Sequence, residues 1–195
     1  MPAPLTEHLR KEDYEVRTCQ LVEAYRLVEL FHYARSTANT ATYRHGLYRR
    51  SDGFMGMIVG AALWQPPMRS TAESLAGDRW RGVLTLSRLV IVPEEPTNAA
   101  SFLLGASIRL IRRDGRFHTL LTYADDSQGH TGTIYRATNW QYVGTVNSER
   151  VYRDKSGRQA SRKAGNKTRT HAEMLALGYQ CDGARPVKHK FVMPL

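Results

Sequence analysis

Asp125, Asp126, His130 and Tyr135 stand close together in the stretch TYADDSQGHTGTIYRATNW, which runs from Thr122 to Trp140. A carboxylate can take up a proton as a general base, and a phenol can donate one as a general acid. A free aspartate is a weak base, but a neighbouring carboxylate or partial burial strengthens it. The stretch therefore predicts an acid–base pair formed by Asp125 and Tyr135.

Both residues also have an ordinary structural interpretation. Asp125 or Asp126 could cap the helix expected to begin near Gly129, because an aspartate oxygen accepts hydrogen bonds from the first amides of a helix. Tyr135 could be a packing residue whose hydroxyl is bonded to an unremarkable neighbour. From the residues alone, both interpretations stay open.

The elements around this stretch predict where it lies in the fold. Gly82 to Val92 and Phe117 to Tyr123 are strand-like, and a helix between them starts at Pro96-Thr97-Asn98 and ends at Asp114-Gly115. The helix carries its apolar stripe at Leu104, Ile108 and Ile111, with Arg109, Arg112 and Arg113 facing out. A strand, helix, strand order with a right-handed crossover makes the two strands parallel neighbours. Ligands bind beyond the carboxyl ends of such strands, which is where the turn after Tyr123 falls.

The first half of the chain completes a mixed sheet. Tyr14 to Cys19 is predicted as a strand, Arg44 to Arg50 and Phe54 to Trp64 as antiparallel strands, and the polar segment 65–78 as a loop. After the first strand, a helix is predicted with its apolar stripe at Leu21, Tyr25, Val28 and His32. We therefore expect an α/β (α+β) fold with a mixed central sheet flanked by helices, in one compact domain spanning 1–195.

Positive charge is concentrated in one segment. The chain has a net charge of +10, and residues 150–169 hold eight cations and one acid, which is +7 and leaves +3 for the rest. The cations of this segment are Arg150, Arg153, Lys155, Arg158, Arg162, Lys163, Lys167 and Arg169. Such a segment either binds a polyanion, with nucleic acid the obvious one, or is a solvated, mobile arm.

The cysteine content and the hydropathy of the sequence limit the cellular compartments in which we expect the protein. Cys19 and Cys181 are too few for a disulfide framework, and neither belongs to a zinc-binding pattern. No apolar run of about 18 residues occurs, and the first residues are too polar for a signal peptide. We expect a soluble protein of a reducing cytoplasm.

At this point the motifs carry a resemblance. A mixed sheet in this order, with a tyrosine on the helix after the second parallel strand, resembles the GNAT acyltransferase fold. The segments LSRLVIVPEEPTNAASFLLGASIRLI, TYADDSQGHTGTIYRATNWQYVG and PVKHKFV resemble the phage Mom family of adenine-modification proteins. The similarity spans roughly Glu29 to the C-terminus and is densest from Ser87 to Gly144. It implies an enzyme of the host-cell cytoplasm that converts DNA adenine to N6-carbamoylmethyladenine and so blocks host restriction enzymes.

The resemblance assigns roles by matching motifs. It implies catalytic roles for Arg88, Ser101, Asp125, Tyr135 and the pair His32-Tyr33. It also implies acetyl-CoA or a related acyl donor, held by Asn98, Ser101 and Arg88. From the residues alone, Ser101 could equally be an ordinary first-turn residue. Arg88 needs a partner within an apolar strand, and either a substrate phosphate or a buried carboxylate would serve.

The predicted cofactor loop departs from the GNAT pattern. GNAT enzymes usually cradle the pyrophosphate of coenzyme A with a glycine-containing loop, whereas the connection here is PEEPTNAAS, with Glu94 and Glu95 and no glycine. Two acids would repel a pyrophosphate. The free amides of the helix from Asn98 to Ser101 could still bind an anion.

A metal site is a weaker hypothesis. Two histidines and one carboxylate can hold non-haem iron, and His32, His45, His130 and Asp125 offer these types. A lone histidine on an apolar helix face is more often a hydrogen-bonded core residue. The resemblance raises the hypothesis because iron has been associated with Mom-type proteins and because adding a carbamoylmethyl group is not simple acyl transfer.

DNA would be the partner of such an enzyme. The exocyclic amine of adenine shares its lone pair with the ring, so it attacks only when a base such as Asp125 removes or polarises its proton. The amine of a paired adenine lies inside the duplex, so the base must be flipped out and stacked on aromatic rings. The aromatic candidates are Tyr33, Tyr43, Tyr48, Trp64, Tyr123 and Trp140. The cations of residues 150–169 would contact phosphates.

Two other classes of protein remain open. A GNAT N-acetyltransferase of a small amine or a protein would share the fold and Tyr135, but it would leave the basic segment without a purpose. A non-catalytic DNA-binding protein would explain the charge and leave Asp125 and Tyr135 as structural residues.

Overall fold

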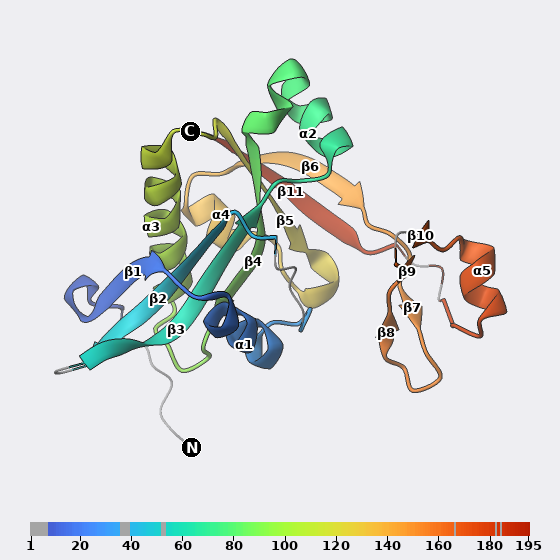
Figure 1. Cartoon of the computed structure of the whole chain (residues 1–195), viewed down its shortest axis with the longest axis horizontal. Helices are drawn as coiled ribbons and strands as arrows, with labels where there is room; N and C mark the ends of the chain where they lie inside the picture. The colour runs from blue at the N-terminus through green and yellow to red at the C-terminus, as the bar shows by residue number, and fades with distance from the viewer. Residues whose placement is uncertain (1–7, 36–39, 52–53, 166, 182, 184) are drawn as a thin grey trace. The chain divides into compact units, whose positions relative to one another are not determined.

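Seven strands form one mixed sheet in the computed structural model, which describes residues 8–35, 40–51, 54–165, 167–181, 183 and 185–195 (Figure 1). Across the sheet the strand order is β1-β2-β3-β4-β5-β11-β6. The strands are β1 Tyr14–Thr18, β2 Tyr43–Ser51, β3 Phe54–Gln65, β4 Val83–Ile91, β5 Thr119–Asp125, β11 Val187–Pro194 and β6 Gln141–Asn147. The strands β1 to β4 pair antiparallel, whereas β4 and β5 pair parallel. The mixed sheet and the parallel pair predicted from the sequence are confirmed.

The chain packs as two compact units. The main unit comprises Met1–Tyr123, Gly132–Val143 and Phe191–Leu195. The basic unit comprises Ala124–Thr131 and Gly144–Lys190 and contains the whole cationic segment. The expectation of one domain over the full chain stays a prediction.

Helices α1 (Leu21–Phe31) and α3 (Ala99–Asp114) cover opposite faces of the sheet in the main unit. Because side chains alternate along a strand, residues an odd number apart on β3 point to opposite faces. Ala61 packs in one apolar cluster with α1, whereas the Trp64 indole donates a hydrogen bond to Ser107 of α3. Figure 1 shows both helices beside the strands β1 to β4.

The apolar stripe predicted for α1 is only partly right. Of the four predicted positions, Val28 is buried, but Tyr25 is 42% exposed and His32 follows the helix in extended backbone. The buried face consists of Ala24, Leu27 and Val28. Ala24 has no side chain beyond Cβ, so this face lets the helix lie close to the sheet and leaves the larger tyrosine outside. A capping box between Gln20 and Glu23 fixes the start of the helix.

The segment 65–78, predicted as a loop, is largely helical, so that prediction is wrong. It contains α2 (Arg69–Ala76) and the start of a 3-10 helix, η2 (Gly77–Gly82). Arg69 pairs with Glu73 at 2.7 Å, and pairs four residues apart stabilise exposed helices. Ala72 is buried in an apolar cluster of the main unit. The Arg69–Glu73 ion pair and the burial of Ala72 stabilise the helix, although the composition of the segment is typical of a loop.

The parallel pairing of β4 with β5 is short. Its register covers three pairs and ends at Thr85 and Leu121, although β4 continues to Ile91 and β5 to Asp125. The Thr85 hydroxyl donates a hydrogen bond of 3.0 Å to the Leu121 carbonyl at this point. Beyond it, within the described residues, the two strands share no further ladder pairs, so their carboxyl-terminal halves are open to other partners.

The helix between these strands has the predicted ends. The predicted core residues Leu104, Ile108 and Ile111 are buried in α3. Gly115 follows with φ of 74°, a left-handed conformation that glycine adopts without strain. The crossover therefore starts at the open end of β4 and returns the chain to the paired end of β5.

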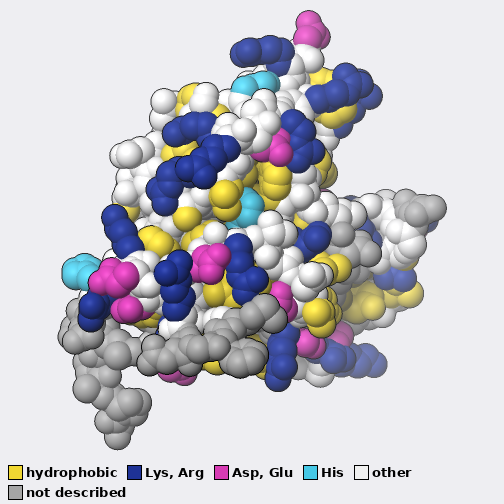
Figure 2. All heavy atoms as spheres, turned by 60° about the vertical axis from the view of Figure 1, so that its left-hand side comes forward, with side chains coloured by type: hydrophobic (Ala, Val, Ile, Leu, Met, Phe, Trp, Pro, Cys, Tyr) yellow, Lys and Arg dark blue, Asp and Glu magenta, His cyan; other side chains and the backbone are white. Residues whose placement is uncertain are grey.

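The basic unit is built from short elements. The cationic segment forms two small sheets, and a short helix follows it; the elements are β7 Tyr152–Arg153, β8 Gln159–Ala160, β9 Lys163–Ala164, β10 Lys167–Thr168 and α5 His171–Ala176. A capping box between Thr170 and Glu173 fixes the start of α5. Cations also occur elsewhere: Figure 2 shows Lys and Arg side chains in several places on one face, with Asp and Glu among them. No helix in the described part of the chain is long and apolar enough to cross a membrane.

Candidate active site

Tyr135 lies on the short helix α4 (Thr133–Ala137) and is buried among aromatic rings. Its ring lies 5.7 Å from that of Trp140 and 5.3 Å from that of Phe191. Gly132, before α4, has φ of 80°, and a Cβ there would meet the Phe191 ring at 2.3 Å. Glycine at this position therefore lets Phe191 pack under the helix that carries Tyr135. The packing interpretation of the Tyr135 ring is confirmed.

The Tyr135 hydroxyl is nevertheless not an ordinary satisfied group. Burial raises its pKa, and the nearby Thr122 hydroxyl opposes the shift without forming a well-aligned hydrogen bond. Thr122 Oγ1 and Trp140 Nε1 are both buried and have no hydrogen-bond partner among the described residues. Buried polar atoms are nearly always satisfied by protein, water or ligand. Two unsatisfied polar atoms on residues that contact or adjoin one protonated phenol therefore mark a place where a polar ligand can bind.

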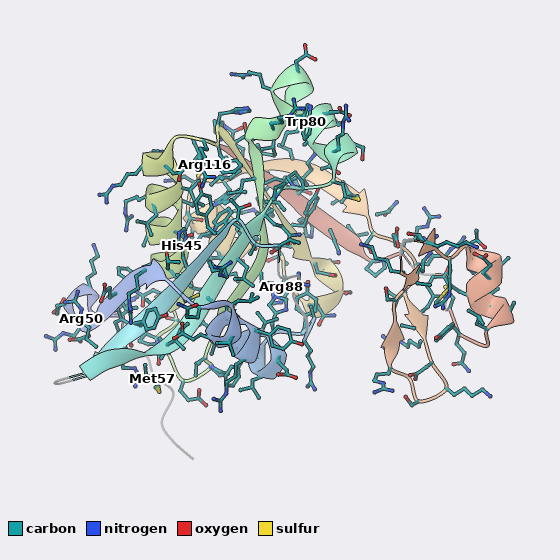
Figure 3. All side chains as sticks on the ribbon, viewed as in Figure 1. His45, Arg50, Met57, Trp80, Arg88 and Arg116 are labelled. Atoms are coloured by element: carbon teal, nitrogen blue, oxygen red, sulfur yellow. The ribbon has the colours of Figure 1, made fainter. Side chains whose placement is uncertain are left out.

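Arg88 and Tyr33 belong to the same part of the main unit. Arg88, labelled in Figure 3, projects from β4, and burial lowers the pKa of its guanidinium while the Tyr33 phenol opposes that shift. Tyr33 also contributes to the raised pKa of Tyr135. One Arg88 nitrogen donates to the Ser87 carbonyl at 2.6 Å. The structure thus brings together three predicted residues, Tyr33, Arg88 and Tyr135.

His32 has a different place from the one predicted. It stacks on Tyr33 with ring centroids 4.4 Å apart, and its Nδ1 accepts a hydrogen bond from the Ala34 amide. Its position is just after α1, so it orients Tyr33 instead of filling the apolar helix face. The pair His32-Tyr33 therefore acts as one stacked group at the end of α1.

The start of α3 is well ordered by its own polar side chains. Ser101 Oγ donates to the Asn98 carbonyl at 2.9 Å, and Asn98 Oδ1 accepts from the Leu9 amide at 2.7 Å. These contacts support the ordinary first-turn interpretation of Ser101. Asn98 makes no side-chain capping bond to α3, so its side chain does not occupy the first amides of the helix.

Glu95 does not face an anion site as its sequence position suggested. Its side chain is buried and accepts a hydrogen bond of 2.6 Å from the Tyr14 hydroxyl. Arg49 forms an ion pair with the other oxygen of the same carboxylate. The repulsion expected between Glu95 and a pyrophosphate is therefore largely removed, because a neighbouring cation balances the charge.

His45 is a core residue, and the metal hypothesis finds no support. In Figure 3 it lies on β2, where it is buried with Nδ1 2.5 Å from Ser107 Oγ. The described residues contain no group of three or more His, Cys, Asp or Glu side chains that could hold a metal ion. The proposed ligand set of His32, His45 and Asp125 is thus not assembled in the described chain. Ser107, which also accepts from Trp64 at 2.7 Å, was missed from the sequence because a small hydroxyl on a helix has no motif.

The burial of His45 predicts that the folded protein loses stability in acid. Burial lowers the pKa of His45 to about 4, from about 6.5 in the unfolded chain. The stability that the neutral, buried His45 contributes is complete above pH 6.5. It is lost as the pH falls from 6.5 towards 4, because the unfolded chain then binds a proton at His45 that the folded chain does not bind. Denaturant unfolding between pH 7 and 4 is expected to lose on the order of 3 kcal/mol through this residue. His45→Gln should flatten the dependence, and equal slopes in both proteins would contradict the assignment.

Asp125 lies in the basic unit and caps a turn. Its Oδ1 accepts from the amide and the hydroxyl of Ser127, at the start of the 3-10 helix η3 (Asp126–Gln128). Its Oδ2 lies 3.7 Å from Lys188 Nζ, and the side chain is only 12% exposed. Asp125 therefore acts as a cap, but of η3, which ends just before Gly129; the helix predicted to begin near Gly129 begins at Thr133 and has no side-chain cap. Because Asp125 and Tyr135 belong to different units, their pairing in one site stays a prediction.

The second acid of the pair and the nearby histidine differ from Asp125. The Asp126 side chain is 54% exposed, and its Oδ1 lies 3.6 Å from His189 Nε2. The His130 amide donates to the Asp125 carbonyl, which closes the turn. Only one of the two adjacent carboxylates is therefore largely shielded from solvent.

The predicted DNA-binding cations are in unequal surroundings. Arg150 and Arg162 line a cavity of the basic unit, whereas Lys155 and Lys163 are exposed. Several others pair locally: Arg153 with the Gly157 carbonyl, Arg158 with Asp154 and Lys167 with Glu173. The Arg169 carbonyl accepts from Arg162. The segment is therefore not a uniform stripe of free charge.

Comparisons with known proteins identify the family of the chain. The model of the Mom protein family matches residues 13–195. The methylcarbamoylase Mom of Escherichia phage Mu is 23% identical over 141 residues, which cover 70% of this chain and 56% of that protein.

Solved structures give the fold. A GNAT family acetyltransferase from Elizabethkingia anophelis with acetyl-CoA bound superposes with a TM-score of 0.56 at 8% identity, covering 95% of this chain and 100% of that one. Spermidine N-acetyltransferase from Vibrio cholerae, in complex with CoA and spermine, gives a TM-score of 0.57 at 7% identity, covering 94% and 96%. At such low identity these likenesses establish the fold alone, and the GNAT-like fold expected from the sequence is confirmed.

Proposed function

Because this chain belongs to the Mom protein family, we propose that it is an enzyme that modifies the N6 amine of adenine in DNA. The proposed product is N6-carbamoylmethyladenine, in which a CH2–CO–NH2 group replaces one hydrogen of the amine. Its proposed purpose is to protect phage DNA from host restriction. The similarity to the phage Mu methylcarbamoylase supports this choice of product.

The observation that carries the proposal is the Tyr135 hydroxyl and its surroundings. It is a buried, protonated phenol beside two unsatisfied polar atoms, Thr122 Oγ1 and Trp140 Nε1. It belongs to the same unit as the parallel strands β4 and β5, whose pairing ends after three residues. A proton donor with open polar contacts is what a transferase needs where a leaving group departs.

The residues around the open strands fit an acyl-CoA thioester. The first turn of α3 is not capped by a side chain, so its amides can bind phosphate oxygens. Glu95, which could have repelled phosphate, is balanced by Arg49. Thr122 Oγ1, on β5, is buried without a partner among the described residues and would hydrogen-bond a polar group of the donor. When bound, an acyl-CoA would supply the two carbons of the transferred group and a thiol leaving group. Attack of N6 on its thioester carbonyl alone gives an N6-acyladenine, so a carbamoylmethyl product also requires a bond from N6 to the CH2 carbon and a separate donor of the amide nitrogen.

The side chains of this protein would handle the protons and the developing charge. One proton must leave the adenine N6 when its bond to carbon forms, and Asp125 is the proposed acceptor. The leaving group must gain a proton, and Tyr135 is the proposed donor because its raised pKa keeps it protonated. Arg88, a buried cation beside Tyr33, would stabilise negative charge on the oxygen of the group being transferred.

Adenine must leave the duplex to reach such a site. Half of the six aromatic residues predicted for stacking are core residues: Trp64, Trp140 and Tyr48 are buried. Tyr33 is exposed, and it interacts with both Arg88 and Tyr135. We infer that Tyr33 stacks on the flipped base.

Mass spectrometry of nucleosides tests the proposal. Plasmid DNA from cells expressing the protein should contain deoxyadenosine carrying one carbamoylmethyl group, and DNA from cells with the empty vector should not. Unmodified DNA with acetylation of a small amine or a protein would instead indicate an N-acetyltransferase. DNA binding by the folded protein without any modified nucleoside would indicate a non-catalytic DNA-binding protein. Either result would overturn the proposal.

A further inference from the structure

The basic unit contains a polar cavity of about 370 Å³. It is lined by Asn147, Ser148, Glu149, Arg150, Tyr152, Arg162, His171 and Arg185. Three arginines face one glutamate, which leaves two net positive charges. The volume is at the lower end of the range for ligand pockets, roughly 300–1,000 Å³, so it holds more than one small ion. Arg185 lies outside the cationic segment and reaches this group only through the fold.

One of the arginines is held in place by the protein, and a second has a buried nitrogen without a partner among the described residues. Arg162 Nε donates to the Arg169 carbonyl at 2.7 Å, which fixes the plane of its guanidinium group. Arg150 Nε is buried and has no hydrogen-bond partner in the part of the chain that the structure describes. A buried guanidinium nitrogen without a partner is costly. An anion that accepts this bond would remove the cost.

Two further side chains are ordered at the wall of the cavity. Tyr152 is buried, and its hydroxyl lies 2.8 Å from His171 Nδ1. With the phenol donating to Nδ1, the histidine proton lies on Nε2, which is then a second donor. Asn147 and Ser148 add neutral donors and acceptors of the kind that contact sugar and phosphate oxygens.

The carboxylate of Glu149 pairs with an arginine that a bound phosphate would contact. Glu149 Oε2 lies 3.3 Å from Arg162 Nη1, but its side chain is 73% exposed. An exposed ion pair of this kind contributes little to stability, because solvent screens it. A phosphate that contacts two or three arginines at once can displace it, because charge-assisted bidentate contacts to arginine are stronger.

We propose that this cavity binds one backbone phosphate of the DNA substrate, with its adjoining sugar, through Arg150, Arg162 and Arg185. The inference rests on the proposed function, and it identifies which of the many cations fix the position of the DNA strand. A strand is favoured over an isolated phosphate because exposed Lys155, Lys163 and Arg158 lie on the same unit and can contact neighbouring phosphates. Arginine forks match phosphate oxygens in geometry as well as charge.

Binding of a labelled, adenine-containing DNA duplex, followed by fluorescence anisotropy, tests the cavity. Arg185→Gln and Arg150→Gln are each expected to weaken binding about tenfold and to lower the slope of log K against log salt by about 0.9. Arg112→Gln removes the same charge from an exposed position on α3, in the main unit, and should weaken binding less than about twofold. Arg185→Lys should recover only part of the loss.

A variant that binds DNA more tightly than the wild-type protein cannot be explained by misfolding. Glu149→Gln removes the competing carboxylate and is expected to tighten DNA binding about threefold. Asp154→Asn removes an equal charge outside the cavity and should have a smaller effect. Equal losses for Arg185→Gln and Arg112→Gln in folded proteins would overturn the proposal, because binding would then depend only on total charge.

A phosphomonoester of the cofactor is the other possible source of the phosphate. Adenosine 3′,5′-bisphosphate provides that group without DNA. The proposal would be wrong if adenosine 3′,5′-bisphosphate binds the wild-type protein but not Arg185→Gln, while that variant keeps its affinity for DNA. The cavity would then be a binding site for the cofactor. Cells that contain no modified nucleoside would count against the proposed enzyme activity, whereas the anisotropy measurements decide the cavity separately.

Discussion

Replacing Tyr135 by phenylalanine is expected to lower the rate of adenine modification about 10²–10⁴-fold, the usual contribution of a general acid. The substitution removes the hydroxyl and keeps the ring that packs on Trp140 and Phe191. Because the hydroxyl makes no well-aligned hydrogen bond to Thr122, stability should change by less than about 1 kcal/mol. Purified protein, a DNA duplex and quantification of modified deoxyadenosine provide the measurement.

Tyr142→Phe is the matched control. Tyr142 also packs against Phe191, with ring centroids 5.4 Å apart, but its side chain is exposed. Loss of this hydroxyl should change the rate less than about threefold if only proton transfer at Tyr135 matters. Equal activities of wild type and Tyr135→Phe would show that Tyr135 is a packing residue and would remove the general acid from the mechanism.

The sequence predicts those parts of the fold that depend on strong periodicity. The long strands β3 and β4 and the helix α3 follow from continuous apolar runs, a clear stripe and a glycine stop at Gly115. The parallel arrangement of β4 and β5 follows from the order strand, helix, strand. Tyr135 on a helix beyond β5 follows from the same order and is confirmed.

Other features depend on interactions that leave no local pattern. The helix α2 was missed because its ion pair of Arg69 with Glu73 and the burial of Ala72 are weak signals in a proline-rich and serine-rich segment. Thr122 and Arg185 were missed because their significance comes from neighbours far apart in the chain. The charge of Glu95 was misjudged because its partners, Tyr14 and Arg49, come from other strands.

These differences change how the predicted site is understood. The residues that the structure brings together, Tyr33, Arg88 and Tyr135, all belong to the main unit, and Tyr135 also adjoins Thr122 and Trp140, whose buried polar atoms have no partner among the described residues. The proposed base and the phosphate cavity belong to the basic unit. The proposed proton acceptor, Asp125, ends strand β5, and the proposed proton donor, Tyr135, lies on α4. The proposed mechanism draws on residues of both units, so substitutions in either unit are expected to lower the modification rate.

The substitution Asp125→Asn tests whether the side chain of Asp125 acts as a proton acceptor or only as a turn cap. Asparagine caps as well as aspartate does, so the hydrogen bonds from Ser127 to the side chain can be kept while the proton acceptor is lost. We expect the modification rate to fall about 10²–10⁴-fold and the free energy of unfolding to change by less than about 1 kcal/mol. The same DNA modification assay and denaturant unfolding measure the two quantities.

Two neighbours provide the controls for this substitution. Lys188→Met removes the ion-pair partner of Asp125, so it reproduces the loss of the pair without removing the carboxylate. Asp126→Asn removes the adjacent, more exposed carboxylate. Both variants should keep the rate within about threefold, because neither alters the group that takes the proton. An Asp125→Asn protein as active as these controls would reduce Asp125 to a turn cap. The proton acceptor would then have to be sought in the main unit, beside Tyr135.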